Sequence, residues 1–122
     1  MNNKKLGTKF ERKLCDILAK YGAWVHFLSP DARGAQPFDI IAVSQDDAAA
    51  IDCKTNKDHI FRSSRLEDNQ IYAFQKWFDC GNTEAYIAVL YDNNIYMLPV
   101  KDVLKEKNID LRKQKVFYKL EE

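Results

Sequence analysis

The 122-residue sequence predicts one α/β domain, residues 1–122, with the element order αβββαββαβ. Apolar residues recur at helical spacing in two separate segments. Short runs rich in β-branched and aromatic residues, separated by polar turns, predict strands between and after those segments. The length is close to the commonest domain size, and 46% hydrophobic with 30% charged residues is typical of a folded chain.

The N-terminal half predicts one helix and three strands. The helix covers residues 3–21, where an apolar stripe is followed by Gly22, a residue that commonly ends helices. Glu11 lies just beside that stripe. Three strands follow at residues 23–28, 38–44 and 48–55, with a loop at 29–37 and a turn at 45–47 that makes the last two strands a hairpin.

The C-terminal half begins with a polar, basic linker at residues 56–65. A second helix is predicted at 66–80, with Gln70 as the polar member of its apolar face and Gly81 at its end. The remaining elements are strands at 83–91 and 94–100 joined by the turn Asp92-Asn93-Asn94, a short helix near 101–107 and a last strand near 115–120.

The sequence argues against a membrane segment and against a disulfide framework. No apolar run approaches the roughly 20 residues that span a bilayer, and the N-terminus has no secretory signal. The three cysteines, Cys15, Cys53 and Cys80, lack the CxxC spacing of zinc sites and are expected to be reduced. These features predict a cytoplasmic protein.

The charge is unevenly distributed although the net charge is only +1. Residues 1–20 hold six basic and two acidic side chains, and residues 54–65 hold four basic and one acidic, whereas 21–53 hold one basic and five acidic. Two basic segments that share one face would bind phosphate. Two solvated charged faces without a ligand are the alternative.

A constellation of charged residues lies in the predicted hairpin. Side chains alternate across a strand, so Asp52 and Lys54 share one face, and Asp39 lies near the same end of the adjacent strand. Two neighbouring carboxylates among apolar residues repel unless a cation binds between them, and Mg²⁺ prefers such oxygen ligands. Together with an ammonium group, this arrangement indicates phosphodiester hydrolysis. The alternative is a surface ion pair between Asp52 and Lys54.

Three segments resemble the PD-(D/E)xK nuclease superfamily: FERKL at 10–14, PFDIIAV at 37–43 and IDCKT at 51–55. Within it, residues 7–104 are similar in element order to cellular Holliday junction resolvases. Ser29 to Gly34, leading to Asp39, resembles the archaeal type, and Gln70 with the later strand pair resembles the RecU type. Asp52 replaces the commoner glutamate, and the chain lacks the long RecU stalk.

The resemblance implies a restriction-endonuclease-like mixed β-sheet flanked by helices and a Mg²⁺-dependent endodeoxyribonuclease, with Mn²⁺ able to substitute. The metal ligands would be Glu11, Asp39, Asp52 and the Cys53 carbonyl. Lys54 would be the catalytic lysine and Gln70 an assisting polar group, although a simple hydrogen bond to the backbone is the alternative for Gln70.

The implied substrate is a four-way DNA junction, which makes the protein a DNA recombination and repair enzyme from a phage or mobile element. Symmetric cleavage needs two sites on a two-fold axis, so a homodimer is expected. The alternatives are another structure-specific or single-strand nuclease of the same fold and a non-catalytic DNA-binding module. The residues expected at the DNA are Lys4, Lys5, Lys9, Ser29, Arg33, Lys57, Arg62 and Arg65; for Ser29, a turn-capping role is the alternative.

Overall fold

The computed structural model describes residues 3–28 and 37–121, with only the backbone for residues 3–6 and 8. The helices are α1 (Asn3–Lys20), α2 (Asp68–Asp79) and α3 (Val100–Glu106). The strands are β1 (Trp24–Phe27), β2 (Ile40–Val43), β3 (Ala48–Thr55), β4 (Ile60–Arg62), β5 (Glu84–Tyr91), β6 (Asn94–Pro99), β7 (Asn108–Asp110) and β8 (Tyr118–Lys119). Two short 3₁₀ turns, Ser63–Arg65 and Leu111–Lys113, complete the order.

Six of the described strands form one mixed sheet in the order β1-β2-β3-β5-β6-β8. β3 and β5 pair in parallel, and the other neighbours in this sheet are antiparallel. The parallel pair requires a crossover connection, which β4 and α2 provide. The predicted α/β class, a mixed sheet flanked by helices, is confirmed.

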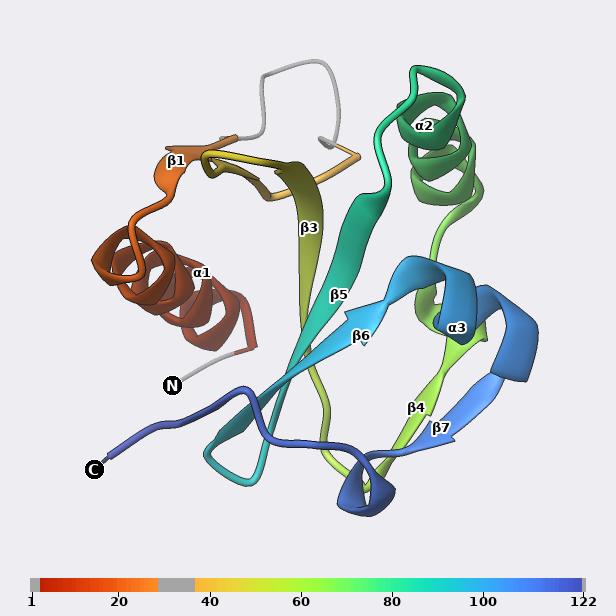
Figure 1. The fold of residues 1–122 in the computed structure, drawn as a ribbon. Helices are drawn as coiled ribbons and strands as arrows, with labels where there is room; N and C mark the ends of the chain where they lie inside the picture. The colour runs from red at the N-terminus through yellow and green to blue at the C-terminus, as the bar shows by residue number, and fades with distance from the viewer. Residues whose placement is uncertain (1–2, 29–36, 122) are drawn as a thin grey trace.

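The helices cover the two faces of this sheet and create two apolar cores. Figure 1 shows α1 on one side of β3 and β5, and α2 and α3 on the other. The α1 core contains Phe10, Leu14 and Ile17 of the predicted stripe, packed with Ile51 of β3. The α2 core contains Phe74 together with Ala50, the residue next to Ile51. Successive residues of β3 therefore face opposite helices.

Local sequence signals explain where several elements end. Gly22 follows α1 with φ 95°, a left-handed conformation that glycine adopts without steric cost. Asp92 and Asn93 join β5 to β6 with φ 50° and 62°, as a two-residue type I′ hairpin turn requires. Asx side chains tolerate this conformation better than other non-glycine residues, which explains the tight turn.

Two features differ from the predictions. The predicted linker at 56–65 contains β4, which pairs with β7 in a separate two-stranded ribbon. Trp24, in the predicted strand 23–28, and Tyr21, the last residue of the predicted helix 3–21, lie outside both cores and are 65% and 66% exposed; Trp24 stacks on His26 and Tyr21 meets Phe117 edge to face. Among the described helices, none is both long enough and apolar enough to cross a membrane.

Candidate active site

The candidate site forms where β3 extends beyond β2. The pairing of β2 with β3 ends at Ile40 opposite Ile51, while β3 continues to Thr55 and pairs there with β5 alone. Because side chains alternate, Asp52 and Lys54 follow Ala50 and face α2, whereas Cys53 follows Ile51 and faces α1. One edge of residues 52–55 is therefore without a neighbouring strand in the described structure.

Asp39 lies at this open edge, one residue before β2 begins. Its backbone N–H donates to the Ile51 carbonyl at 3.0 Å, which holds the residue against β3. Its side-chain Oδ2 accepts a hydrogen bond from the Cys53 N–H at 2.8 Å. The N–H and C=O of one strand residue point to the same side, so the Cys53 carbonyl also faces Asp39.

Asp52 is the most deeply buried charged group of the described residues, with 2% of its surface exposed. Its Oδ1 accepts a hydrogen bond from Gln70 Nε2 at 2.9 Å, and its Oδ2 lies 3.1 Å from Lys54 Nζ. This buried Oδ2 nevertheless accepts no hydrogen bond of acceptable geometry. Burial raises the pKa of Asp52 to about 7; the Lys54 charge opposes this shift, and the neighbouring Asp39 carboxylate adds to it.

Glu11 approaches the same region from α1. Burial, followed by repulsion from Asp39, raises the pKa of Glu11 to about 7. Two carboxyl groups beside Asp39 therefore hold protons unusually tightly. Burial and the neighbouring carboxylates also raise the pKa of the Cys53 thiol well above its usual range, so this thiol is protonated and is not a thiolate ligand.

Gln70 links α2 to β3. Its Oε1 accepts a hydrogen bond from the Glu67 backbone N–H at 3.1 Å and lies 3.4 Å from Lys54 Nζ, while its Nε2 donates to Asp52. The Glu67 side chain accepts from the Gln70 backbone, which completes a capping box at the start of α2. The helix cap thereby fixes which end of the amide faces Asp52.

The donor set suits a hard divalent cation. Asp39 and Asp52 provide carboxylate oxygens, one of which is buried and accepts no hydrogen bond of acceptable geometry, and the Cys53 carbonyl lies on the same edge of β3 as Asp39. A bound cation would offset the burial that raises the pKa of Asp52 and would relieve the repulsion from Asp39 that adds to this shift. Among the described residues, no three His, Cys, Asp or Glu side chains form a complete metal site. Backbone and water oxygens would therefore have to complete the coordination.

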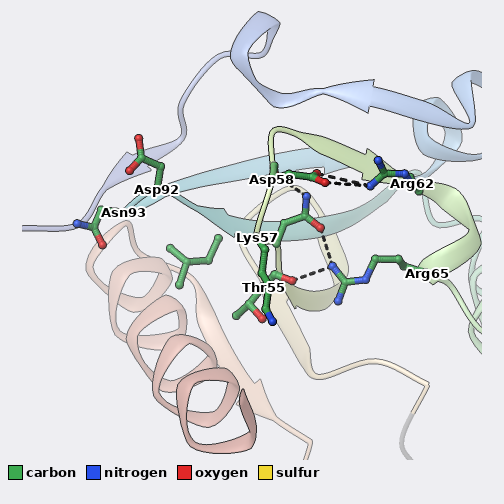
Figure 2. A pocket seen from close by; sticks show the side chains of 9 residues that line it. Thr55, Lys57, Asp58, Arg62, Arg65, Asp92 and Asn93 are labelled. Carbon is green, nitrogen blue, oxygen red and sulfur yellow. Dashed lines mark hydrogen bonds and ion pairs between the residues drawn. The ribbon is translucent and has the colours of Figure 1, made fainter. Parts of the chain in front are cut away.

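Several of the residues predicted to bind DNA meet near the end of β3. A hollow of about 610 Å³, which we call the β3–β4 hollow, lies between Thr55, the segment after it and the β5–β6 turn. Figure 2 shows the side chains that line it. Three cations, Lys57, Arg62 and Arg65, line it together with two acids, Asp58 and Asp92. Arg65 Nη1 donates to the Thr55 carbonyl and to Asn56 Oδ1, both at 2.7 Å, and Arg62 pairs with Asp58 at 3.4 Å.

The other predicted DNA contacts lie elsewhere or are not described. Lys9 is exposed on α1. The backbone of Lys4 and Lys5 is part of α1, but their side chains lie outside the described structure. Ser29 and Arg33 lie outside the described residues altogether. Asn56 was not singled out from the sequence: its Nδ2 donates to the carbonyls of Asp58 and Ile60 at 2.8 Å and fixes the turn. The spacing Asn-x-Asp, typical of turns, was the available signal.

Comparisons with known proteins agree with this arrangement. The family model for the archaeal Holliday junction resolvases (Hjc) matches residues 2–121. Among solved structures, Hjc from the archaeal hyperthermophile Archaeoglobus fulgidus, a Holliday junction resolvase determined at 1.6 Å, aligns with a TM-score of 0.65 and 22% identity. The alignment covers 84% of this chain and 85% of that chain, and it supports the fold. None of the curated proteins matches.

The family match extends over nearly the whole chain and includes the helix, the hairpin and the strand that carry Glu11, Asp39, Asp52 and Lys54. The match agrees with the resemblance that the sequence motifs indicate, and the solved structure has the same class of fold. The chain therefore belongs to the archaeal Holliday junction resolvase family, and it is a metal-dependent nuclease that resolves four-way DNA junctions.

Proposed function

We propose that Glu11, Asp39, Asp52 and the Cys53 carbonyl hold Mg²⁺ in this nuclease, and that Lys54 is its catalytic lysine. The observation that carries the proposal is the buried Asp52 Oδ2, which accepts no hydrogen bond of acceptable geometry although Lys54 Nζ lies 3.1 Å away, and whose carboxylate is repelled by Asp39. Such an atom is costly to bury unless a cation neutralises it. Mg²⁺ suits the proposal because it takes oxygen ligands and keeps several waters.

Bound Mg²⁺ would supply Lewis-acid stabilisation of charge on a phosphoryl oxygen. The chain itself supplies the ammonium of Lys54, held 3.1 Å from Asp52 Oδ2 on the side of β3 that faces α2. From there Lys54 stabilises negative charge on the phosphate or orients the attacking water. Its partial burial, with 17% of the side chain exposed, strengthens that interaction relative to bulk water.

Gln70 acts in this proposal by positioning the two charged groups. Its amide donates to Asp52, and its carbonyl lies near Lys54, so one side chain sets the orientation of both. The carbonyl also accepts from the Glu67 N–H, and the amide cannot rotate without losing that bond. Gln70 therefore restricts Asp52 Oδ1 to a hydrogen bond and leaves Oδ2 for the cation.

The DNA backbone is expected to approach over the β3–β4 hollow. Lys57, Arg62 and Arg65 provide the phosphate contacts there, and the bond from Arg65 to Thr55 places a guanidinium one residue from Lys54. Phosphate neutralisation supplies most of the affinity of proteins for DNA. Two copies of the chain are expected to act together, because paired cuts in a four-way junction need two sites on a two-fold axis.

The test of this proposal combines cleavage with melting. Asp39→Asn retains an oxygen that accepts from the Cys53 N–H, so the fold is expected to persist. The variant should lose cleavage of a four-way junction, keep DNA binding and lose the rise in melting temperature that millimolar Mg²⁺ gives the parent protein. Its melting temperature without metal should hold or rise, because one of the repelling carboxylates is gone.

Asp46→Asn is the matched control, because Asp46 is an exposed acid in the β2–β3 turn, outside the site. This control should cleave and respond to Mg²⁺ as the parent does. Normal cleavage by Asp39→Asn, or loss of its stability without metal, would make the carboxylates structural. Replacing Mg²⁺ with Mn²⁺ or Ca²⁺ in the same assays identifies the metal that supports cleavage.

A further inference from the structure

Two basic hollows lie on opposite sides of the β5–β6 turn. The β3–β4 hollow is one of them. The second, which we call the α1 hollow, has a volume of about 560 Å³ and is lined along α1 by Lys9, Arg12 and Lys13. Leu90 and Asn93 line both hollows, so the end of β5 and the turn after it form their common wall.

The cations of the α1 hollow are available to a ligand. Lys9, Arg12 and Lys13 are spaced i, i+3 and i+4, which places them on one side of the helix. In the described part of the chain, none of the three forms a hydrogen bond or an ion pair within the protein, and all are exposed. Asp16 and Glu121 border the same hollow and limit its basic surface to the turn of α1 from Lys9 to Lys13.

The common wall is held on both sides. The Asn56 N–H donates to the Leu90 carbonyl at 2.9 Å, and the Leu120 N–H donates to the Asn93 carbonyl at 2.8 Å. The type I′ turn between them adds a rigid two-residue connection. A wall tied to the β3–β4 segment and to the C-terminal segment keeps the two hollows apart.

The turn also carries a negative charge. Asp92 is exposed, lines the β3–β4 hollow at the wall but not the α1 hollow, and, among the described residues, has no ion-pair partner. A phosphate backbone that crossed the turn from one hollow to the other would meet this carboxylate, and like charges repel. The charge pattern is therefore positive, negative, positive across the wall, which disfavours one continuous backbone and favours two backbones that separate at the wall.

We propose that the β5–β6 turn divides a branched DNA, directing the backbone of one arm into the β3–β4 hollow and that of a second arm into the α1 hollow. This inference rests on the proposed function insofar as the cut strand runs along the β3–β4 hollow. It assigns junction recognition to Arg12, Lys13 and Asp92, residues outside the catalytic group. A linear duplex is a single arm, so its backbone occupies only one of the two hollows.

The first test removes the cations of the α1 hollow with Arg12→Gln and Lys13→Gln together. Without divalent metal, the double variant should bind a four-way junction about tenfold more weakly and reduce the slope of log affinity against log salt by about two. Its affinity for a linear duplex of equal arm length should change by less than about twofold, because phosphate contacts in the β3–β4 hollow remain. Lys101→Gln with Lys105→Gln, on α3 across the sheet, is the matched control and should change neither affinity.

The second test is Asp92→Asn, which keeps a side chain that tolerates the left-handed backbone at this position. Removing the charge should raise the affinity for linear duplex about threefold, because one backbone can then cross the wall, and raise the junction affinity less. Discrimination between the two DNAs should fall accordingly. A melting curve like that of the parent protein verifies the fold of each variant.

Equal losses of junction and duplex affinity in the α1 variant would mean that both hollows hold one continuous arm, and unchanged junction affinity would remove the α1 hollow from the DNA surface. Either result overturns the proposal, as does an Asp92→Asn variant with unaltered discrimination. These binding measurements need no metal and no cleavage. Their failure is therefore distinguishable from failure of the catalytic roles, which the Asp39→Asn cleavage and melting experiment tests.

Discussion

Gln70 Nε2 donates to Asp52 Oδ1 at 2.9 Å while the Oε1 of the same amide accepts from the Glu67 backbone N–H at 3.1 Å. A backbone N–H can only donate, so the oxygen of the amide must face Glu67 and the nitrogen must face Asp52. The orientation of a buried amide is thus set by the first turn of α2. The site consequently depends on a helix start that lies outside β2 and β3.

Gln70→Glu tests this dependence with nearly the same shape. The new carboxylate still accepts from the Glu67 N–H, but it places a second acceptor against Asp52 Oδ1 and removes the donor. We expect cleavage to fall by about 100-fold and the metal-free protein to lose about 1–3 kcal/mol of stability at pH 8, because a buried hydrogen bond is replaced by repulsion. Gln75→Glu, an exposed change on the same helix, is the control. Full activity of Gln70→Glu would leave Gln70 only a structural role.

The stability of the metal-free protein should depend on pH in an unusual direction. The pKa values of Glu11 and Asp52 rise from 4.5 and 3.8 to about 7 on folding, so the folded chain binds more protons than the unfolded chain between about pH 4 and 7. Stability should therefore decrease as the pH rises through that window. Urea unfolding at pH 5.5 and pH 8 in the presence of a chelator measures the difference.

Mg²⁺ should reverse that trend, because it competes with protons for the same carboxylates. The metal-induced rise in melting temperature is expected to be larger at pH 8 than at pH 5.5. Asp52→Asn should flatten both dependences, since it removes one of the two shifted groups. A metal response that is independent of pH would argue against binding at these carboxylates.

Lys54→Met keeps the aliphatic length of the side chain and removes its charge. Asp52 Oδ2 then loses the cation at 3.1 Å, so the pKa of Asp52 should rise further above its usual range. We expect cleavage to fall by about 10²- to 10⁴-fold, the usual range for a lost catalytic group, while Mg²⁺ still stabilises the protein above pH 8. Loss of cleavage together with loss of the metal response would instead assign Lys54 a role in holding the metal ligands, and full cleavage would rule out a catalytic role.

Arg65 and Arg62 line the same hollow but should behave differently when each is changed to Gln. Arg62 pairs with exposed Asp58, so Arg62→Gln should weaken DNA binding and lower the salt slope by about one without changing the cleavage rate at saturating DNA. Arg65 also bonds the Thr55 carbonyl next to Lys54, so Arg65→Gln should lower that rate as well. Single-turnover cleavage and salt titrations separate the two effects, and identical behaviour of the variants would rule out a positioning role for Arg65.

The sequence predicted the elements that local pattern determines. The apolar stripe of α1, the limits of β3 at 48–55 and the tight turn at Asp92 are all confirmed, because helical spacing, strand alternation and Asx turn chemistry act over a few residues. The close placement of Asp39, Asp52 and Lys54 also followed from alternation in one hairpin. Their catalytic roles, and a phage or mobile-element source, stay predictions.

The unpredicted features depend on contacts between distant segments. β4 and β7 are three residues each and pair across nearly 50 positions of sequence, which leaves no local signal strong enough to mark them. The contact of Gln70 with Asp52 likewise depends on the placement of α2 against β3. The exposure of Trp24 also depends on tertiary structure, because β1 is the edge strand of the sheet and one face of it remains exposed.

The early end of β2 has a consequence for assembly as well as for chemistry. An unpaired strand edge is a template for pairing with another chain, and within residues 3–28 and 37–121 no strand covers this edge of residues 52–55 of β3. The Asp39 carboxylate occupies the position that a neighbouring strand's carbonyl would take at the Cys53 N–H, and the adjacent charges repel an incoming strand. The reactive centre thus also protects the sheet from aggregation, so Asp39→Ala, which loses that acceptor, should self-associate on storage where Asp39→Asn does not.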